Sequence, residues 1–168
     1  SAEVIPDYKA WRRKDGSITE AVKAASFDSS NYHSLLRSIQ QQGIVLDATL
    51  TVFEQHRDRG PNRELMFQHG IFLTKLALKQ GITLAAGTDT FDDAAPLPML
   101  HHELKLLVEL AGLTPAQAVI AGTANSAAVL GLKHDRGTIE VGKRACFIHF
   151  SDDLTIQQVW YDGEPCIN

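Results

Sequence analysis

Cysteine and long apolar stretches are both scarce in this sequence. The two cysteines, Cys146 and Cys166, do not have the spacing of a metal-binding pair. Both fall in segments that favour strands, and we interpret them as free thiols in a reducing compartment rather than as a disulfide. The first residues have neither the basic start nor the apolar stretch of a signal peptide. We therefore expect a cytoplasmic protein.

No run of apolar residues approaches the roughly 20 that span a bilayer, so we expect no membrane partner. An excess of positive charge is also missing, because 16 Lys and Arg stand against 20 Asp and Glu, for a formal net charge of -4. That balance gives no electrostatic reason to expect nucleic acid. The short basic segment 12–14 is interpreted as the solvated end of a helix.

The residues that are present favour a packed domain. The chain has 168 residues, of which 44% are hydrophobic, enough for one core or for a small domain with an appendage. Apolar spacing predicts helices over 32–42 and 65–80. Apolar runs predict buried strands over 44–51 and 82–87. No hairpin signal separates the two strands, so the alternation predicts an α/β fold in which they are parallel and joined by a crossover helix.

The pattern after residue 90 predicts helices as far as residue 130, and antiparallel strands beyond residue 131. Apolar spacing predicts a helix over 100–111. The sequence Thr-Pro-Ala-Gln at 114–117 is typical of a helix start, and Gly-Thr at 122–123 is expected to interrupt that helix before a short one over 125–130. Beyond residue 131 the chain predicts antiparallel strands, joined at their end by the hairpin turn Asp162-Gly163. These strands are expected over 138–141, 145–150 and 156–161.

One carboxylate occupies a position where ligand chemistry is common. Asp89 directly follows Gly87 and Thr88 at the end of the second predicted strand. In barrels and open α/β sheets, ligands bind at the carboxyl ends of the strands. A carboxylate there can bind a metal, take a proton from water, or do both. It can equally cap the following segment or bond the loop backbone, and the spacing by itself leaves both possibilities open.

Several segments, in their order and spacing, resemble the C-terminal region of the amidohydrolase superfamily. The resemblance covers most of the chain after about residue 28 and is strongest over 82–145. The imidazolonepropionase and prolidase-like members form the most similar branch. The matching segments are GITLAAGTD at 81–89, LHHEL at 100–104, AGLTPAQA at 111–118, ANSAA at 124–128, LGL at 130–132 and GTIEVGK at 137–143.

The resemblance implies the C-terminal part of a (β/α)8 TIM-type barrel, namely its last two strands and helices, followed by antiparallel strands of a small β-sandwich. We accordingly divide the chain into residues 1–132, a partial barrel segment, and residues 133–168, a partial sandwich segment. The implied activity is hydrolysis of C–N bonds in cyclic amides, amides or dipeptides by a metal-activated water. Asp89 matches the family's last-strand aspartate, which binds zinc or another divalent metal and shuttles the water's proton to the leaving group.

Most of the family's metal site has no counterpart in this sequence. A whole barrel takes about 250 residues, and only 88 precede Asp89. The family's His-x-His pair does not occur, and none of the seven histidines ends a predicted buried strand. His56, in the loop after the first strand, is the histidine best placed to approach a substrate. Because a catalytic zinc typically takes three protein ligands plus water, we expect this chain alone to bind no stoichiometric zinc and to be inactive.

Three hypotheses for the function remain open. In the first, the chain is part of a metal hydrolase, its partner is the missing N-terminal segment, and the complete enzyme acts on a small-molecule amide substrate. In the second, it is a non-catalytic barrel remnant, a self-associating or binding protein whose partner is a second copy (a homodimer). In the third, it is an unrelated small α/β binding module. Unpaired sheet edges favour association in the first two, through 100–111, 145–150 and 156–167.

Overall fold

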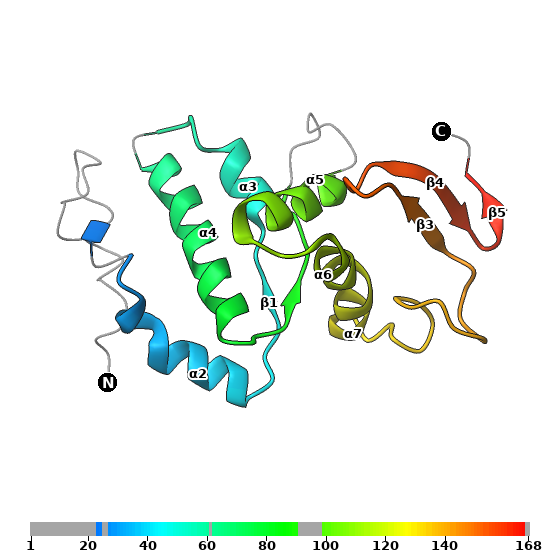
Figure 1. Cartoon of the computed structure of the whole chain (residues 1–168), viewed down its shortest axis with the longest axis horizontal. Helices are drawn as coiled ribbons and strands as arrows, with labels where there is room; N and C mark the ends of the chain where they lie inside the picture. The colour runs from blue at the N-terminus through cyan, green and yellow to red at the C-terminus, as the bar shows by residue number, and fades with distance from the viewer. Residues whose placement is uncertain (1–22, 25–26, 61, 91–98, 167–168) are drawn as a thin grey trace.

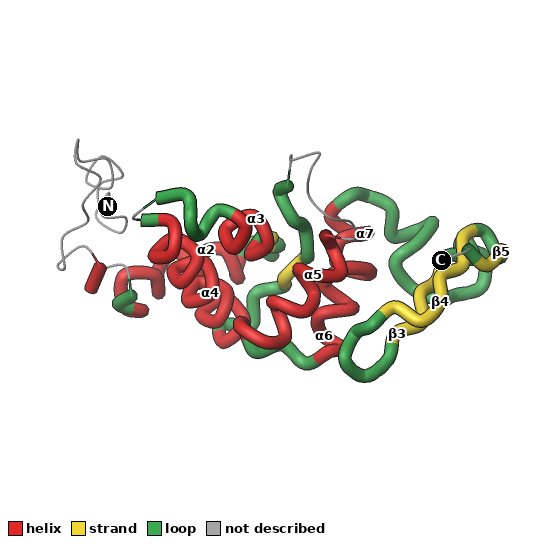
Figure 2. The backbone as a smooth tube through the Cα atoms, turned by 90° about the horizontal axis from the view of Figure 1, so that it is seen from above, coloured by secondary structure: helices red, strands yellow, loops and turns green. Residues whose placement is uncertain are grey.

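A computed structural model describes residues 23–24, 27–60, 62–90 and 99–166. Helices α2 (His33–Gln41) and α4 (Arg63–Lys79) lie at one end of an elongated molecule, and a small antiparallel sheet lies at the other (Figure 1). The view from above shows the same separation, with further helices between the two ends (Figure 2). The basic segment 12–14 lies outside the described residues. No helix in the described ranges is long and apolar enough to cross a membrane.

Two short parallel strands pair beside these helices. β1 (Leu46–Asp47) lies parallel to β2 (Leu84–Ala85), with Leu46 opposite Leu84 and Asp47 opposite Ala85. Helix α4 makes the crossover between them, as parallel strands require. The predicted parallel pairing is therefore confirmed.

Both strands are shorter than predicted, and the first gives way to a helix. Residues predicted as its end belong to α3 (Leu50–Gln55), so the prediction of a strand through residue 51 is wrong there. Thr49 has φ 48 and ψ 40, a left-handed conformation that ends the strand. The carboxylate of Glu103 then accepts hydrogen bonds from the backbone N–H groups of Leu50 and Thr51. A tertiary contact thus overrides the apolar pattern that favoured a strand.

The two helices at the first end form as their spacing predicts. Before α2, the Asp28 carboxylate accepts a hydrogen bond from the backbone N–H of Ser30 at 2.9 Å, which starts a short 3-10 turn (Ser29–Tyr32). In α4, residues at intervals of three and four face the core, which is the helical period. The buried side chains of α4 are Phe67, Ile71, Thr74 and Ala77. The three apolar ones share one core with Leu36, Leu50, Leu84 and Leu107.

The central helices are more continuous than predicted. α5 (Met99–Leu106) widens into a π-helical turn (Leu107–Ala111) that ends at Gly112, where φ is 88. α6 (Pro115–Ile120) begins with the predicted capping box, in which Thr114 Oγ1 accepts from the backbone N–H of Gln117 and the Gln117 side chain bonds back to Thr114. That prediction is confirmed.

The expected break at 122–123 is wrong, because a second π-helical turn (Ala121–Asn125) joins α6 to α7 (Ser126–Val129). The Ala121 carbonyl accepts a hydrogen bond from the backbone N–H of Ala86 at 3.2 Å and another from the Ser126 hydroxyl at 2.7 Å. The Asn125 side chain donates to the Leu84 carbonyl at 2.8 Å. Gly122 allows close packing here, since a Cβ would lie 2.9 Å from a methyl carbon of Leu104, which would have to shift. The helix therefore covers the far edge of β2.

The second end of the molecule is an antiparallel sheet. Its strands are β3 (Phe147–Phe150), β4 (Ile156–Tyr161) and β5 (Glu164–Pro165), hydrogen-bonded in that order. The turn between the last two has φ 51 at Asp162 and φ 86 at Gly163, as a tight hairpin requires. The rings of Phe147 and Trp160 pack across β3 and β4 with centroids 5.1 Å apart. The predicted hairpin and both longer strands are confirmed.

The strand predicted over 138–141 is wrong. Gly137 and Gly142 have φ 99 and 92, and between them the chain forms bends and turns, including a hydrogen bond from the Lys143 N–H to the Glu140 carbonyl. The apolar side chains in this segment are open to solvent, with Ile139 85% and Val141 107% exposed. The segment 138–141 has the alternating apolar pattern of a strand, but it pairs with no other strand within the described part of the chain.

Candidate functional site

The carboxyl ends of β1 and β2 lie side by side because the two strands are parallel and in register. The Asp47 side chain leaves β1 toward the neighbouring chain, where its Oδ1 accepts a hydrogen bond from the backbone N–H of Gly87 at 2.7 Å. A Cβ on Gly87 would lie 2.2 Å from Asp47 Oδ2, closer than any real contact, so this approach requires glycine. The Gly-Thr-Asp segment that leaves β2 is thus tied to the end of β1.

Asp89 lies two residues after Gly87, whose N–H bonds Asp47. It is exposed and has φ 49, a left-handed conformation that Asp adopts more readily than most residues. On either side of it, the hydroxyls of Thr88 and Thr90 are 3.0 Å apart. Its carboxylate is therefore accessible at the strand end where the sequence placed it. Its role in metal binding and catalysis stays a prediction.

Thr49 is the second left-handed residue at this edge of the strands. A β-branched residue in this conformation is a genuine outlier. Such strain persists only where the surrounding structure enforces it, and it is found preferentially at functional sites. Both strands therefore lead into a left-handed residue other than glycine within a few positions of their ends.

Glu103 on α5 enforces the conformation after Thr49. Its side chain is fully buried and accepts hydrogen bonds from the Leu50 N–H at 3.0 Å and from the Thr51 N–H and hydroxyl, both at 2.7 Å. Burial raises the pKa of this carboxyl above its ordinary value; the hydrogen bonds from Thr51 and Leu50 oppose that rise, and the nearby charge of Asp47 adds to it. Sequence reasoning assigned no role to Glu103. The available signal was its position on the apolar face that defines the helix over 100–111.

The histidines are distributed over several elements. His102, which the spacing placed on the solvent side, is exposed and bonds Glu54 of α3, while His101 on the same helix contacts the Leu154 carbonyl at 2.6 Å. His56 ends α3, and its Nδ1 lies 2.7 Å from the Val52 carbonyl oxygen of the same helix. None of the contacts seen in the described ranges joins a histidine to Asp89.

The donor set for a metal is incomplete in the part of the chain that the structure describes. Three or more His, Cys, Asp or Glu side chains suited to holding an ion do not gather anywhere in it. Asp89 fits as one oxygen donor, but a catalytic zinc typically needs three protein ligands. The described residues therefore do not by themselves fit the metal that the resemblance implies.

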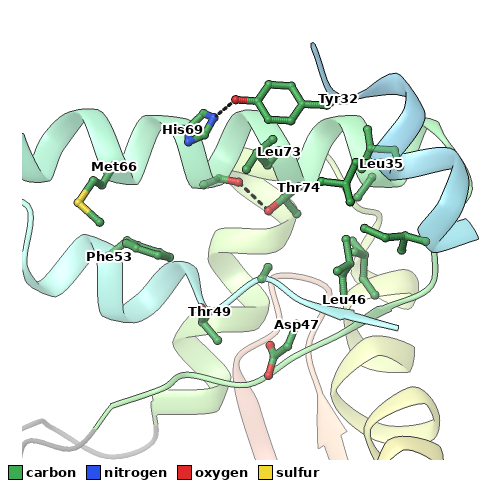
Figure 3. A pocket seen from close by; sticks show the side chains of 16 residues that line it. Tyr32, Leu35, Leu46, Asp47, Thr49, Phe53, Met66, His69, Leu73 and Thr74 are labelled. Carbon is green, nitrogen blue, oxygen red and sulfur yellow. Dashed lines mark hydrogen bonds between the residues drawn. The ribbon is translucent and has the colours of Figure 1, made fainter. Parts of the chain in front are cut away.

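An apolar cavity of about 600 Å³ lies between α2, α4 and β1 (Figure 3). At one rim, the hydroxyl of Tyr32 and Nε2 of His69 are 2.9 Å apart, and Leu73 lies beneath them (Figure 3). At the opposite rim lie Asp47 and Thr49, which belong to the carboxyl end of β1 described above. Leu46 of β1 and its register partner Leu84 of β2 both line the cavity, so it borders one face of the strand pair. In the described residues β1 pairs with β2 alone.

Comparison with known proteins identifies the family. A family model described as "Amidohydrolase family" matches residues 10–166, nearly the whole chain. The chain belongs to this family. The resemblance to the amidohydrolase superfamily that the sequence motifs indicated is therefore confirmed.

Individual relatives match parts of the chain. An imidazolonepropionase of Deinococcus deserti is 39% identical over 94 residues, covering 49% of this chain and 23% of that protein. An N-acetylgalactosamine-6-phosphate deacetylase of Escherichia coli O157:H7 is 36% identical over 58 residues, covering 34% of this chain and 15% of that protein.

Solved structures agree with these relatives. A Bifidobacterium longum structure assigned to a prolidase has a TM-score of 0.63 at 28% identity, covering 74% of this chain and 35% of that one. A Xaa-Pro dipeptidase has a TM-score of 0.70 at 18% identity, a likeness of fold alone, over 88% of this chain and 41% of that one. The chain thus spans less than half the length of each relative and each solved chain.

Proposed function

We propose that this chain forms the C-terminal part of a metal-dependent amidohydrolase that cleaves C–N bonds, and that Asp89 is its contribution to the metal site. The observation that carries the proposal is the accessible Asp89 carboxylate beyond the end of β2, in a chain of this family. In barrels, catalytic residues come from the carboxyl ends of several strands. The substrate class is a cyclic amide, an amide or a dipeptide, in keeping with the names of the relatives.

In this proposal, zinc or another divalent metal, when bound, would supply the Lewis acidity that lowers the pKa of a water molecule and polarises the scissile carbonyl. Asp89 contributes one carboxylate ligand and accepts and delivers the proton that water loses. The tie between Asp47 and Gly87 fixes the backbone that carries Asp89. The other donors come from the N-terminal segment that the longer relatives have, and the 168-residue chain by itself is inactive.

The barrel assignment belongs to the same proposal. β1 and β2 are the last two strands of a (β/α)8 barrel, and residues 133–168 form part of a small β-sandwich. The edge of β1 that has no partner strand in the described ranges suits another strand. The proposed occupant of this place is the N-terminal segment that the longer relatives have.

The non-catalytic alternative, a self-associating barrel remnant, is favoured by one specific observation. Apolar side chains near the sheet of β3 to β5 are open to solvent: Leu130 is 70% exposed, and Ile139 and Val141 more so. Such a patch typically marks an interaction site. A second copy of the chain is its proposed partner.

The two functions are separated by expressing the whole polypeptide encoded around these residues and the 168-residue chain in parallel. Metal content is measured by elemental analysis, and hydrolysis is measured on an imidazolone, on Xaa-Pro dipeptides and on an N-acetylated sugar phosphate. We expect metal and activity in the whole polypeptide, neither in the 168-residue chain, and a loss of at least about 100-fold in kcat in Asp89→Ala, as for loss of a catalytic group.

The matched control is Asp152→Ala, an equally exposed carboxylate in the turn between β3 and β4, which leaves metal and activity unchanged. A whole polypeptide with neither metal nor activity overturns the proposal in favour of the alternative. Full activity in Asp89→Ala overturns the role proposed for Asp89.

A further inference from the structure

We propose that Glu103 is a positioning residue for Asp89, which it holds in place from α5 by fixing the segment between β1 and α3. The inference rests on the proposed function of Asp89. It extends that function by assigning a task to a buried carboxylate that belongs to neither strand end.

The start of α3 depends on Glu103. The first N–H groups of a helix lack partners within the helix, and Thr49, at the cap position, forms no side-chain hydrogen bond to them. Leu50 and Thr51 are fully buried, so water does not replace the missing partners. Glu103, 52 residues along the chain from Thr51, accepts from both N–H groups and from the Thr51 hydroxyl. The left-handed turn at Thr49 therefore persists because Glu103 satisfies the residues that follow it.

The same segment is tied at its other end to the loop that carries Asp89. The Asp47 carboxylate accepts a hydrogen bond from the Gly87 N–H at 2.7 Å. Asp47 lies three residues before Leu50, and Gly87 lies two residues before Asp89. Gly87 precedes Asp89 in the chain and Glu103 follows it. Asp89 thus lies between two anchor points that both hold the segment from Asp47 to Thr51.

The chemistry of the contact requires a carboxylate. All three groups that face Glu103 donate hydrogen bonds, and a carboxylate only accepts, with two oxygens. A glutamine of nearly the same shape offers one oxygen and turns an N–H₂ group toward donors. The conservative variant Glu103→Gln therefore weakens the anchor without leaving a cavity.

The first test compares two amide protons by NMR exchange in the 168-residue chain. The Gly87 N–H bonds Asp47, and the Leu46 N–H bonds the Thr83 carbonyl between the strands, which reports general stability. In Glu103→Gln we expect Gly87 exchange to rise at least about tenfold, with Leu46 changed less than about twofold, as for a local opening. The control Glu109→Gln, an exposed carboxylate further along the same helix, leaves both rates unchanged.

A rise that is equal at Gly87 and Leu46, or no rise at Gly87, overturns the proposal, because Glu103 then contributes only to general stability. If Glu103→Gln does not fold, Thr51→Val decides instead. It removes the hydroxyl donor and keeps both backbone donors. A smaller rise confined to Gly87 supports the proposal, and an equal change at both amides overturns it.

The second test uses the whole polypeptide with the substrate that it hydrolyses. We expect Glu103→Gln to lower kcat at least about tenfold with KM within about twofold, as for an effect on the reacting groups alone, while Glu109→Gln matches the wild type. An unchanged kcat overturns the proposal. A wild-type polypeptide with no activity overturns the proposed function of Asp89, and the exchange comparison still decides whether Glu103 positions its loop.

Discussion

The region around β1 and β2 differs from the sheet of β3 to β5 in how its polar and apolar side chains are accommodated. Around the parallel strands, polar side chains bond groups distant in the sequence: Glu103 is fully buried with three donors, and Asp47 and Asn125 bond backbone groups of a neighbouring segment. Around the antiparallel sheet, apolar side chains point into solvent, with Val141 107% exposed. The first region is stabilised by its own long-range hydrogen bonds, whereas the second presents surface that suits a partner.

The largest loss of stability is expected for Glu103→Ala, in the region around β1 and β2. The substitution leaves three buried donors without an acceptor and creates a cavity, so we expect the free energy of unfolding to fall by about 3 kcal/mol. Urea denaturation monitored by circular dichroism measures the change. Glu140→Ala, in the exposed segment near the sheet, is the control and gives no resolvable change. Equal midpoints for the two variants contradict the expectation.

Gly87→Ala tests the contact between the strand ends. The new Cβ would lie 2.2 Å from Asp47 Oδ2, so the carboxylate has to move and its bond to the residue 87 N–H is lost. We expect a loss of about 2 kcal/mol in the same denaturation experiment, typical of overpacking at a tight contact. Gly60→Ala is matched, because its nearest atom is 3.9 Å away, and should change stability by less than about 0.5 kcal/mol.

The pH dependence of stability sharpens the comparison further. Burial, the largest cause, raises the pKa of Glu103 in the folded protein above the ordinary value of 4.5. Between these two pKa values the folded state binds more protons than the unfolded state, so stability falls as pH rises. The contribution of this group is complete below pH 4.5 and is lost as pH rises through the folded pKa.

Glutamine does not titrate, so the stability of the wild type minus that of Glu103→Gln should decrease as pH rises from about 4.5. Unfolding curves for both proteins over a pH series measure this difference. A difference that grows with pH over this window contradicts the predicted direction.

The smallest effect on stability is expected at the exposed apolar segment. The double variant Ile139→Ser and Val141→Ser should change the free energy of unfolding by less than about 0.5 kcal/mol, because neither side chain is buried in the chain itself. It should nevertheless lower self-association, measured by light scattering over a dilution series. Gln157→Ser, exposed on β4, is the control and should associate like the wild type. A well-folded wild-type monomer at every concentration refutes the association hypothesis.

Signals confined to a few neighbouring residues were predictable. The capping box of Thr114 and Gln117, the turn at Asp162 and Gly163 and the period of α4 each depend on contacts within a few positions of the chain. The family motifs are also local strings, and they placed Asp89 at the end of the second strand. Local backbone preferences and side-chain spacing act in the same way in many folds, so a sequence pattern carries them directly.

Contacts between distant residues were not predictable. Leu50 and Thr51 have a strand-like pattern but begin a helix, because Glu103 supplies their acceptors from 52 and 53 residues away. Thr138 to Val141 alternates like a strand but forms turns, because a strand needs a neighbour to pair with and none lies beside it in the described ranges. The sequence alone determined the family, the order of most elements and the place of Asp89. The tertiary structure decided where β1 ends and what holds that end, because a buried N–H is satisfied by whichever acceptor the fold brings to it.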